Sequence, residues 1–95
     1  MRMLRFVVAV ACAAAAGVVL AQAGADVVKT KGCLTCHAVD QKKVGPSFKD
    51  IAAKHKGDAK AGGMLAAKLK EGTGHPKIAA TDAELKAAVE YVLSR

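Results

Sequence analysis

Apolar residues recur at helical spacing near the end of the chain. In residues 81–95, TDAELKAAVEYVLSR, the apolar positions follow an i, i+3, i+4, i+7 pattern. They are Leu85, Ala88, Val89 and Val92. Thr81 is followed three residues later by Glu84, which is the pattern of a capping box. The sequence therefore predicts an amphipathic helix that begins after Thr81 and buries one face.

Three shorter helices are predicted upstream. The first covers residues 25–31, and the second opens at Pro46 and runs through Ile51 and Ala52, with Pro46 near its first turn. The third covers residues 59–70, and its inward-facing residues are predicted to be Met64, Leu65 and Leu69. No run of β-branched residues alternates with period two, and no internal repeat occurs. The pattern predicts a single all-α domain of about four short helices.

The first 23 residues have the pattern of a cleaved secretory signal peptide. Two arginines precede fifteen residues without a polar side chain, residues 6–20, and the small-residue sequence Ala21-Gln22-Ala23 follows. Fifteen apolar residues fall short of the roughly twenty that span a membrane. We therefore expect cleavage after Ala23, export of residues 24–95 as one domain, and no stable membrane anchor afterwards.

Removal of this segment leaves little material for a core. The formal net charge of +7 loses two arginines, and Phe48 and Tyr91 become the only aromatic residues. Cys12 leaves with the signal, so Cys33 and Cys36 are the two remaining cysteines. A domain this small, rich in alanine, buries too little apolar surface to fold comfortably without a covalent or bound stabilising group.

The segment GCLTCHAVD, residues 32–40, indicates what that group is. Two cysteines separated by two residues and followed directly by His37 form the attachment pattern of a c-type haem. Helical curvature through Leu34 and Thr35 would place His37 against the iron. Three alternatives compete: a redox-active CxxC would prefer a strand-to-helix setting, a zinc site needs four ligands, and a plain disulfide leaves His37 unexplained. The pattern favours one covalently attached haem.

The chain resembles the small bacterial class I cytochromes c, which carry electrons in the periplasm. The resemblance covers residues 26–95 and rests on KGCLTCHAVDQKKVGPSFKDIAAK and on the final amphipathic segment. It implies an all-α fold wrapped round the haem, with the first and last helices crossing. It also implies that His37 is the proximal iron ligand and that the Pro46 carbonyl accepts its Nδ1 proton, which would fix the ring.

The second axial position is where the sequence departs from this family. Relatives place a methionine before a proline in the loop that precedes the last helix, and here His75 stands before Pro76 in GTGHP. His75 is therefore the expected sixth ligand. Met64, on a helix where a methionine is more often core filling, and an open site are the alternatives. His55, in the lysine-rich segment AAKHKGD, is expected to be a solvated surface residue.

Two histidine ligands favour electron transfer over catalysis, because no coordination position is left for a substrate. Loss of the methionine also removes the ligand that raises the potential of cytochromes c. The expected function is therefore a periplasmic single-electron carrier and not an enzyme. A haem-based gas sensor and an electron-entry subunit of a larger oxidoreductase remain alternatives.

The distribution of lysines indicates which partner proteins this chain could bind. Lys42 and Lys43 follow the haem motif, and six more are spread over the chain: Lys29, Lys31, Lys49, Lys54, Lys56 and Lys60. This surface either serves solubility or docks redox partner proteins with acidic surfaces. Nucleic acid is not an expected partner of an exported protein.

Overall fold

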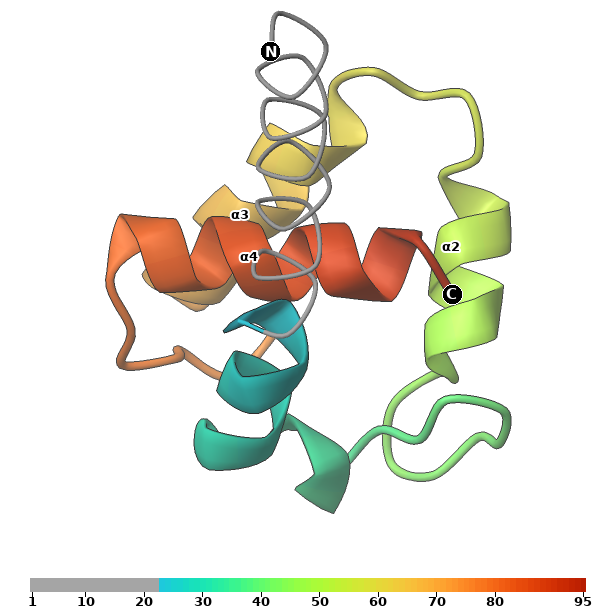
Figure 1. Cartoon of the computed structure of the whole chain (residues 1–95), viewed down its shortest axis with the longest axis horizontal. Helices are drawn as coiled ribbons and strands as arrows, with labels where there is room; N and C mark the ends of the chain where they lie inside the picture. Colours follow the sequence, from blue (N-terminus) through green and yellow to red (C-terminus); the bar gives the residue numbers. More distant parts are fainter. Residues whose placement is uncertain (1–22) are drawn as a thin grey trace, which may run out of the picture.

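The computed structural model describes residues 23–95. Residues 23–30 are helical, and four further elements follow: η1 (Cys33–Thr35), α2 (Phe48–Lys54), α3 (Ala61–Glu71) and α4 (Asp82–Leu93) (Figure 1). The described residues contain no strand, so the all-α prediction is confirmed. The predicted signal peptide lies outside the described residues, apart from Ala23.

Side-chain caps define where two of the helices begin. Thr81 Oγ1 accepts a hydrogen bond from the Glu84 amide at 3.2 Å, and Glu84 Oε1 accepts one from the Thr81 amide at 3.0 Å. The predicted capping box is therefore present. At the start of α2, Ser47 Oγ accepts from the Asp50 amide at 3.1 Å, and Pro46 lies just outside this cap.

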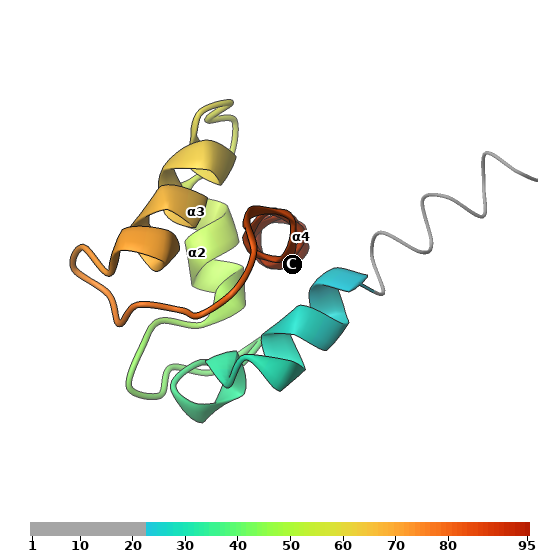
Figure 2. The ribbon, with the colours of Figure 1, turned by 90° about the vertical axis from the view of Figure 1, so that its left-hand side faces the viewer.

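Helix α4 organises the core, because it packs against both α2 and α3. Three of the four predicted inward residues, Leu85, Ala88 and Val89, are buried, and the fourth, Val92, is half-buried. Ala88 joins Val28 and Phe48 in the central cluster, in which each side chain is at most 5% exposed. Figure 2 looks down α4 and shows the N-terminal helical segment lying across it, so the implied crossing of first and last helices is confirmed.

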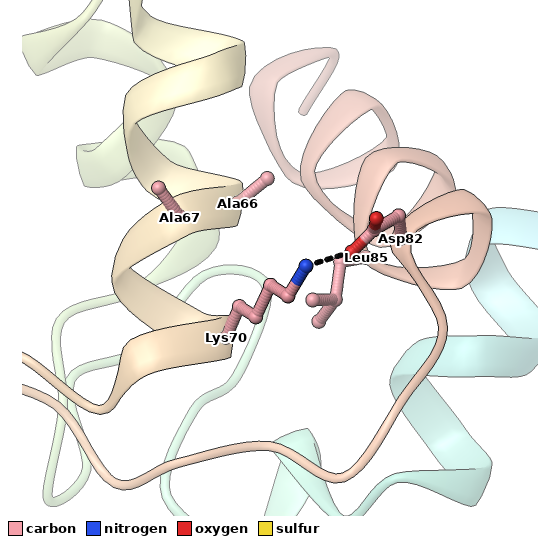
Figure 3. A pocket seen from close by; sticks show the side chains of 5 residues that line it. All are labelled: Ala66, Ala67, Lys70, Asp82 and Leu85. Carbon is pink, nitrogen blue, oxygen red and sulfur yellow. Dashed lines mark ion pairs between the residues drawn. The ribbon is translucent and has the colours of Figure 1, made fainter.

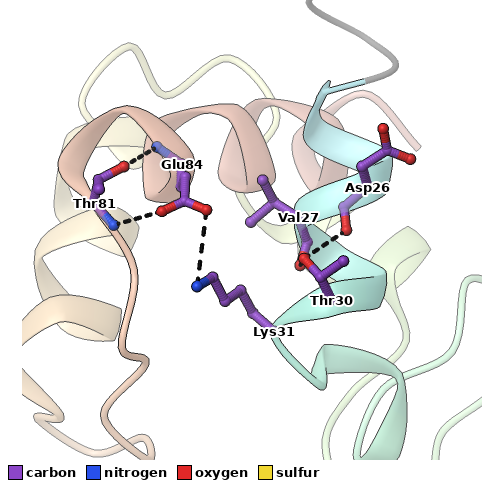
Figure 4. A network of polar contacts seen from close by, with 6 residues as sticks. All are labelled: Asp26, Val27, Thr30, Lys31, Thr81 and Glu84. Atoms are coloured by element: carbon purple, nitrogen blue, oxygen red, sulfur yellow. Dashed lines mark hydrogen bonds and ion pairs between the residues drawn. The ribbon is translucent and has the colours of Figure 1, made fainter.

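A polar contact connects these two crossing helices (Figure 4). Lys31 Nζ lies 3.8 Å from Glu84 Oε2, while the other oxygen of the same carboxylate accepts from Thr81. The hydrogen bonds with the backbone and side chain of Thr81 lower the pKa of Glu84, and the charge of Lys31 adds to this effect. Ionised Glu84 is therefore favoured in the folded protein.

We expect the contribution of Glu84 to stability to depend on pH. A carboxyl whose pKa is lowered by folding contributes fully above its ordinary value of 4.5, and the contribution disappears as the pH falls through the lower folded value. Glu84→Gln should therefore destabilise the protein at neutral pH and match the wild type in strong acid. Denaturant unfolding at several pH values measures this. A destabilisation that is equal at all pH values would contradict the assignment.

The prediction for Met64 is wrong. Helix α3 begins at Ala61, and its inward stripe is the buried Ala61 followed at i+4 and i+8 by the half-buried Leu65 and Leu69. One residue turns a helix by about 100°, so Met64 lies beside this stripe, and it is 50% exposed. It is not core filling. No helix among the described residues is long and apolar enough to cross a membrane.

Candidate functional site

His37 follows a short 3₁₀ turn that fixes its position relative to the two cysteines. The amides of Cys36 and His37 both donate to the Cys33 carbonyl, at 3.2 and 3.0 Å. This is the curvature that the motif predicted through Leu34 and Thr35. The turn is closed on the other side by the Gly45 amide, which donates to the Cys36 carbonyl at 2.8 Å.

A backbone carbonyl orients the His37 ring. Its Nδ1 lies 2.7 Å from the carbonyl oxygen of Pro46, the contact that the family resemblance implies. A carbonyl oxygen can only accept, so the proton of the neutral imidazole is on Nδ1. Nε2 is then left with a free lone pair, which is the state that a metal ligand requires.

Gly45 packs directly against the same ring. A Cβ built at this position would overlap the His37 imidazole, contacting Cε1 and lying 2.9 Å from Nδ1. Only glycine leaves room for the ring to sit on the backbone here. The loop of residues 38–47 is closed behind it by two bonds, from the Phe48 amide to the Ala38 carbonyl and from the Lys49 amide to the Val39 carbonyl.

His75 lies in the loop between α3 and α4. Helix α3 ends at Glu71 and is capped by Gly72, whose φ of 74° is in the left-handed region that glycine adopts without strain. The chain then turns back toward the segment that follows η1, as Figure 2 shows. His75 Nδ1 lies 2.8 Å from the Pro76 carbonyl, so here too Nδ1 carries the proton and Nε2 is free.

The structure brings the two histidines together, although 38 positions of numbering separate His37 from His75. Their ring centroids are 6.0 Å apart and their planes differ by 7°. Two imidazoles bound to one metal ion through bonds of about 2 Å have centroids about 6 Å apart. The centroid distance and the small angle between the ring planes therefore match those of two imidazoles bound to one iron, and each ring has Nε2 available for it.

The two cysteines of the motif are not joined to each other by a disulfide, so both are available for thioether bonds. Cys33 and Cys36 are both free thiols and half-buried, so the alternative of a disulfide between them has no support in this structure. Burial raises the pKa of the Cys33 thiol, which favours the protonated form at neutral pH.

The remaining candidates occupy other places. Met64 is half-exposed on α3. His55 is the C-cap of α2 and lines a surface groove of about 530 Å³ between α2 and the end of α4. It is half-buried, so the expectation of a fully solvated residue is only partly met.

Two aromatic side chains connect the His37 ring to the core of the protein. The His37 ring lies 5.5 Å from the ring of buried Phe48, which meets Tyr91 of α4 edge-on at 6.4 Å. The core that the helices form is therefore continuous with the proximal face of the site.

Comparison with known proteins identifies the family to which this all-α fold and its site belong. A family model for cytochrome c matches residues 21–95. The cytochrome c-551 of Azotobacter vinelandii is 44% identical over 80 residues, which cover 77% of this chain and 98% of the relative. The cytochrome c-551 of Pseudomonas aeruginosa is 42% identical over 74 residues, covering 70% and 71% of the two chains.

Comparison with solved structures supports the same family. The crystal structure of Nitrosomonas europaea cytochrome c552 superposes with a TM-score of 0.63 at 36% identity, covering 74% of this chain and 96% of that one. The chain belongs to the cytochrome c family, among the small monohaem class I members. Membership implies one covalently attached haem c with its iron, to which the CLTCH motif fits, and electron transfer through that haem.

Two features of the site were not found from the sequence. The sequence pattern does not single out Gly45, although a glycine directly before Pro46 is a signal for a close approach of the backbone. Lys43 is more than a surface charge, because its Nζ donates to the Leu34 carbonyl at 3.0 Å and connects the loop to the haem motif. Nothing in the sequence pattern indicates that bond.

Proposed function

We propose that this protein is a periplasmic electron carrier whose single haem has two histidine ligands. Cys33 and Cys36 form the thioether bonds, His37 is the proximal ligand, and His75 is the distal ligand. The Pro46 carbonyl orients His37 and raises the basicity of its Nε2.

The observation that carries this proposal is the facing of His37 and His75, with rings 6.0 Å apart and nearly parallel. Each ring also donates its Nδ1 proton to a proline carbonyl, which leaves both Nε2 atoms free. The bound haem supplies a one-electron redox centre. With both axial positions filled by protein, no site is open to a substrate, so the role is transfer of electrons and not catalysis.

The ligand pair also sets the potential. A methionine ligand raises the potential of cytochromes c, and His75 replaces it. We therefore place this carrier at a lower potential than relatives with a methionine ligand. The apolar run and small-residue site of residues 1–23 support export, after which residues 24–95 form the carrier.

The spectra of the ferric protein test the ligand assignment. We expect low-spin iron without the weak near-infrared band of a methionine sulfur–iron bond. Because the two rings are within 7° of parallel, both donate into the same iron d orbital, and the electron paramagnetic resonance signal should be rhombic. A high-spin spectrum would contradict distal ligation by His75.

Carbon monoxide separates this carrier from a gas sensor. A firmly bound His75 should make binding of carbon monoxide to the reduced wild-type protein slow, whereas a sensor with an open or labile site would bind the gas at once.

The alternative of an electron-entry subunit is tested separately, by purification from the native source and a search for co-eluting subunits.

Partner docking is proposed at the surface around the haem motif. Val44 is 83% exposed on the loop that also carries the exposed Lys42, and Leu34 of η1 is 39% exposed. Apolar residues beside a lysine suit a small, transient contact with an acidic redox protein.

Charge reversal tests this surface. Lys42→Glu should slow electron transfer to the natural partner, and added salt should slow the wild type, since screening limits exposed charges to about 10 Å at 0.1 M salt. Lys43 is a poor choice for reversal because it bonds to the Leu34 carbonyl. Lys54→Glu on α2 makes the same charge change elsewhere and serves as the control. Equal rates for both variants, or no salt dependence, would assign the lysines to solubility.

A further inference from the structure

The loop that carries His75 is tied together at its two ends. Lys70 lies in the last turn of α3, and Asp82 is the first residue of α4 (Figure 3). Lys70 Nζ lies 2.9 Å from Asp82 Oδ1. The Ile78 amide donates to the Leu69 carbonyl at 2.9 Å across the same loop. One ion pair and one backbone bond therefore close the base of the segment from which His75 projects.

The turns joined by the ion pair are those that open most easily. The last turn of a helix and the first turn of the next lack full intrahelical hydrogen bonding. An eleven-residue helix is marginal by itself, and α3 contains Gly62 and Gly63, each costing helix stability. A Cβ at either glycine would meet nothing within 4 Å, so no packing within the described residues requires them. Besides its packing against α4, helix α3 is therefore stabilised by the ion pair of Lys70 with Asp82.

The free energy of this ion pair is small compared with that of global unfolding but not with that of opening a loop. Hydrogen bonding and attraction to Asp82 raise the pKa of Lys70, but the side chains are 60% and 78% exposed. Such a surface pair adds little to the stability of a whole domain. Local opening of a loop requires much less free energy than global unfolding, so the same small contribution is a large share of it.

We propose that Lys70 and Asp82 are positioning residues for His75. Their ion pair sets how often the loop between α3 and α4 opens, and so how readily an added ligand competes with His75. This inference rests on the proposed bis-histidine site and assigns to two exposed side chains the control of how firmly that site is closed.

The test is the rate of carbon monoxide binding to the reduced holoprotein. Carbon monoxide is neutral, so charge changes act on the protein and not on the encounter. Lys70→Met and Asp82→Asn should each raise the rate roughly two- to five-fold. The double variant should raise it no further than the larger single change, because both remove one interaction. Salt should raise the wild-type rate and leave the double variant unaffected.

A control and a second readout keep the result specific. Lys68→Met neutralises a neighbouring exposed lysine in the same helical turn and should leave the rate unchanged. Amide exchange at Ile78 should speed up in Lys70→Met, while that of Val89 in the core of α4 should not. An unchanged carbon monoxide rate, additive single effects or a salt-independent wild type would overturn the proposal.

Failure of this inference differs from failure of the bis-histidine assignment. If His75 does not bind iron, the wild type binds carbon monoxide as quickly as His75→Ala, and the ferric spectra of the two proteins coincide. If only the ion-pair role is wrong, those spectra still differ and the Lys70 and Asp82 variants behave as wild type.

Discussion

Replacing both Cys33 and Cys36 by alanine is expected to abolish covalent haem attachment, and either single change should leave at most one thioether bond. Cys33 begins η1 and Cys36 directly follows it, which is the spacing that a c-type haem requires. The protein mass, measured after acid denaturation, reports attachment directly: the wild type should retain the mass of one haem. The double variant should not.

Loss of attachment should also deplete folded protein. Phe48 and Leu85 are the largest fully buried side chains among the described residues, and the other buried apolar residues are valines and alanines. The polypeptide therefore has a small core, and we expect it to depend on the haem as its main apolar body. Cys12→Ala is the matched control, because this cysteine lies in the predicted signal segment and should not affect attachment. A stable, folded, haem-free double variant, in particular one that contains zinc, would contradict the assignment.

Local signals predicted much of the fold. The capping box at Thr81 and Glu84 and the spacing of Leu85, Ala88 and Val89 depend only on near neighbours, and the structure reproduces them. The start of α3 has no capping box: its N-cap Lys60 makes no side-chain cap, and the Asp58 carboxylate accepts from the Lys60 amide instead. Met64 stands next to Leu65 in the sequence, so the apolar pattern allowed it on the inward side, whereas the structure buries Ala61 and turns Met64 toward solvent.

Contacts between distant segments limited what could be predicted of the site. The bond from His37 to Pro46 could be anticipated because the family resemblance implies it. The tie between Lys70 and Asp82 could not, since it depends on how α3 and α4 meet. Neither could the parallel setting of His37 and His75, which depends on the path of the loop after Gly72.

Changing His75 to alanine should open the sixth position of the iron. The ferric protein should become largely high spin, and cyanide or carbon monoxide should bind quickly. Changing His75 to methionine should instead restore a sulfur–iron bond and raise the potential, because the axial ligand is a main determinant within a haem range of roughly 0.8 V. Optical spectra and a redox titration measure both effects.

Met64→Leu is the control that distinguishes the two candidate ligands. Met64 is half-exposed on α3, so leucine there should leave the spin state and potential nearly unchanged. If Met64 were the ligand, the results would exchange: its leucine variant would lose the sulfur band and become high spin, and alanine at position 75 would have little effect. If neither change alters the spectrum, the protein does not fill the sixth position, and a gas-binding function would replace that of a carrier. The 6.0 Å between the ring centroids of His37 and His75 fits a metal ion bound to both imidazoles. We therefore expect His75→Ala to change the spectrum and Met64→Leu to leave it unchanged.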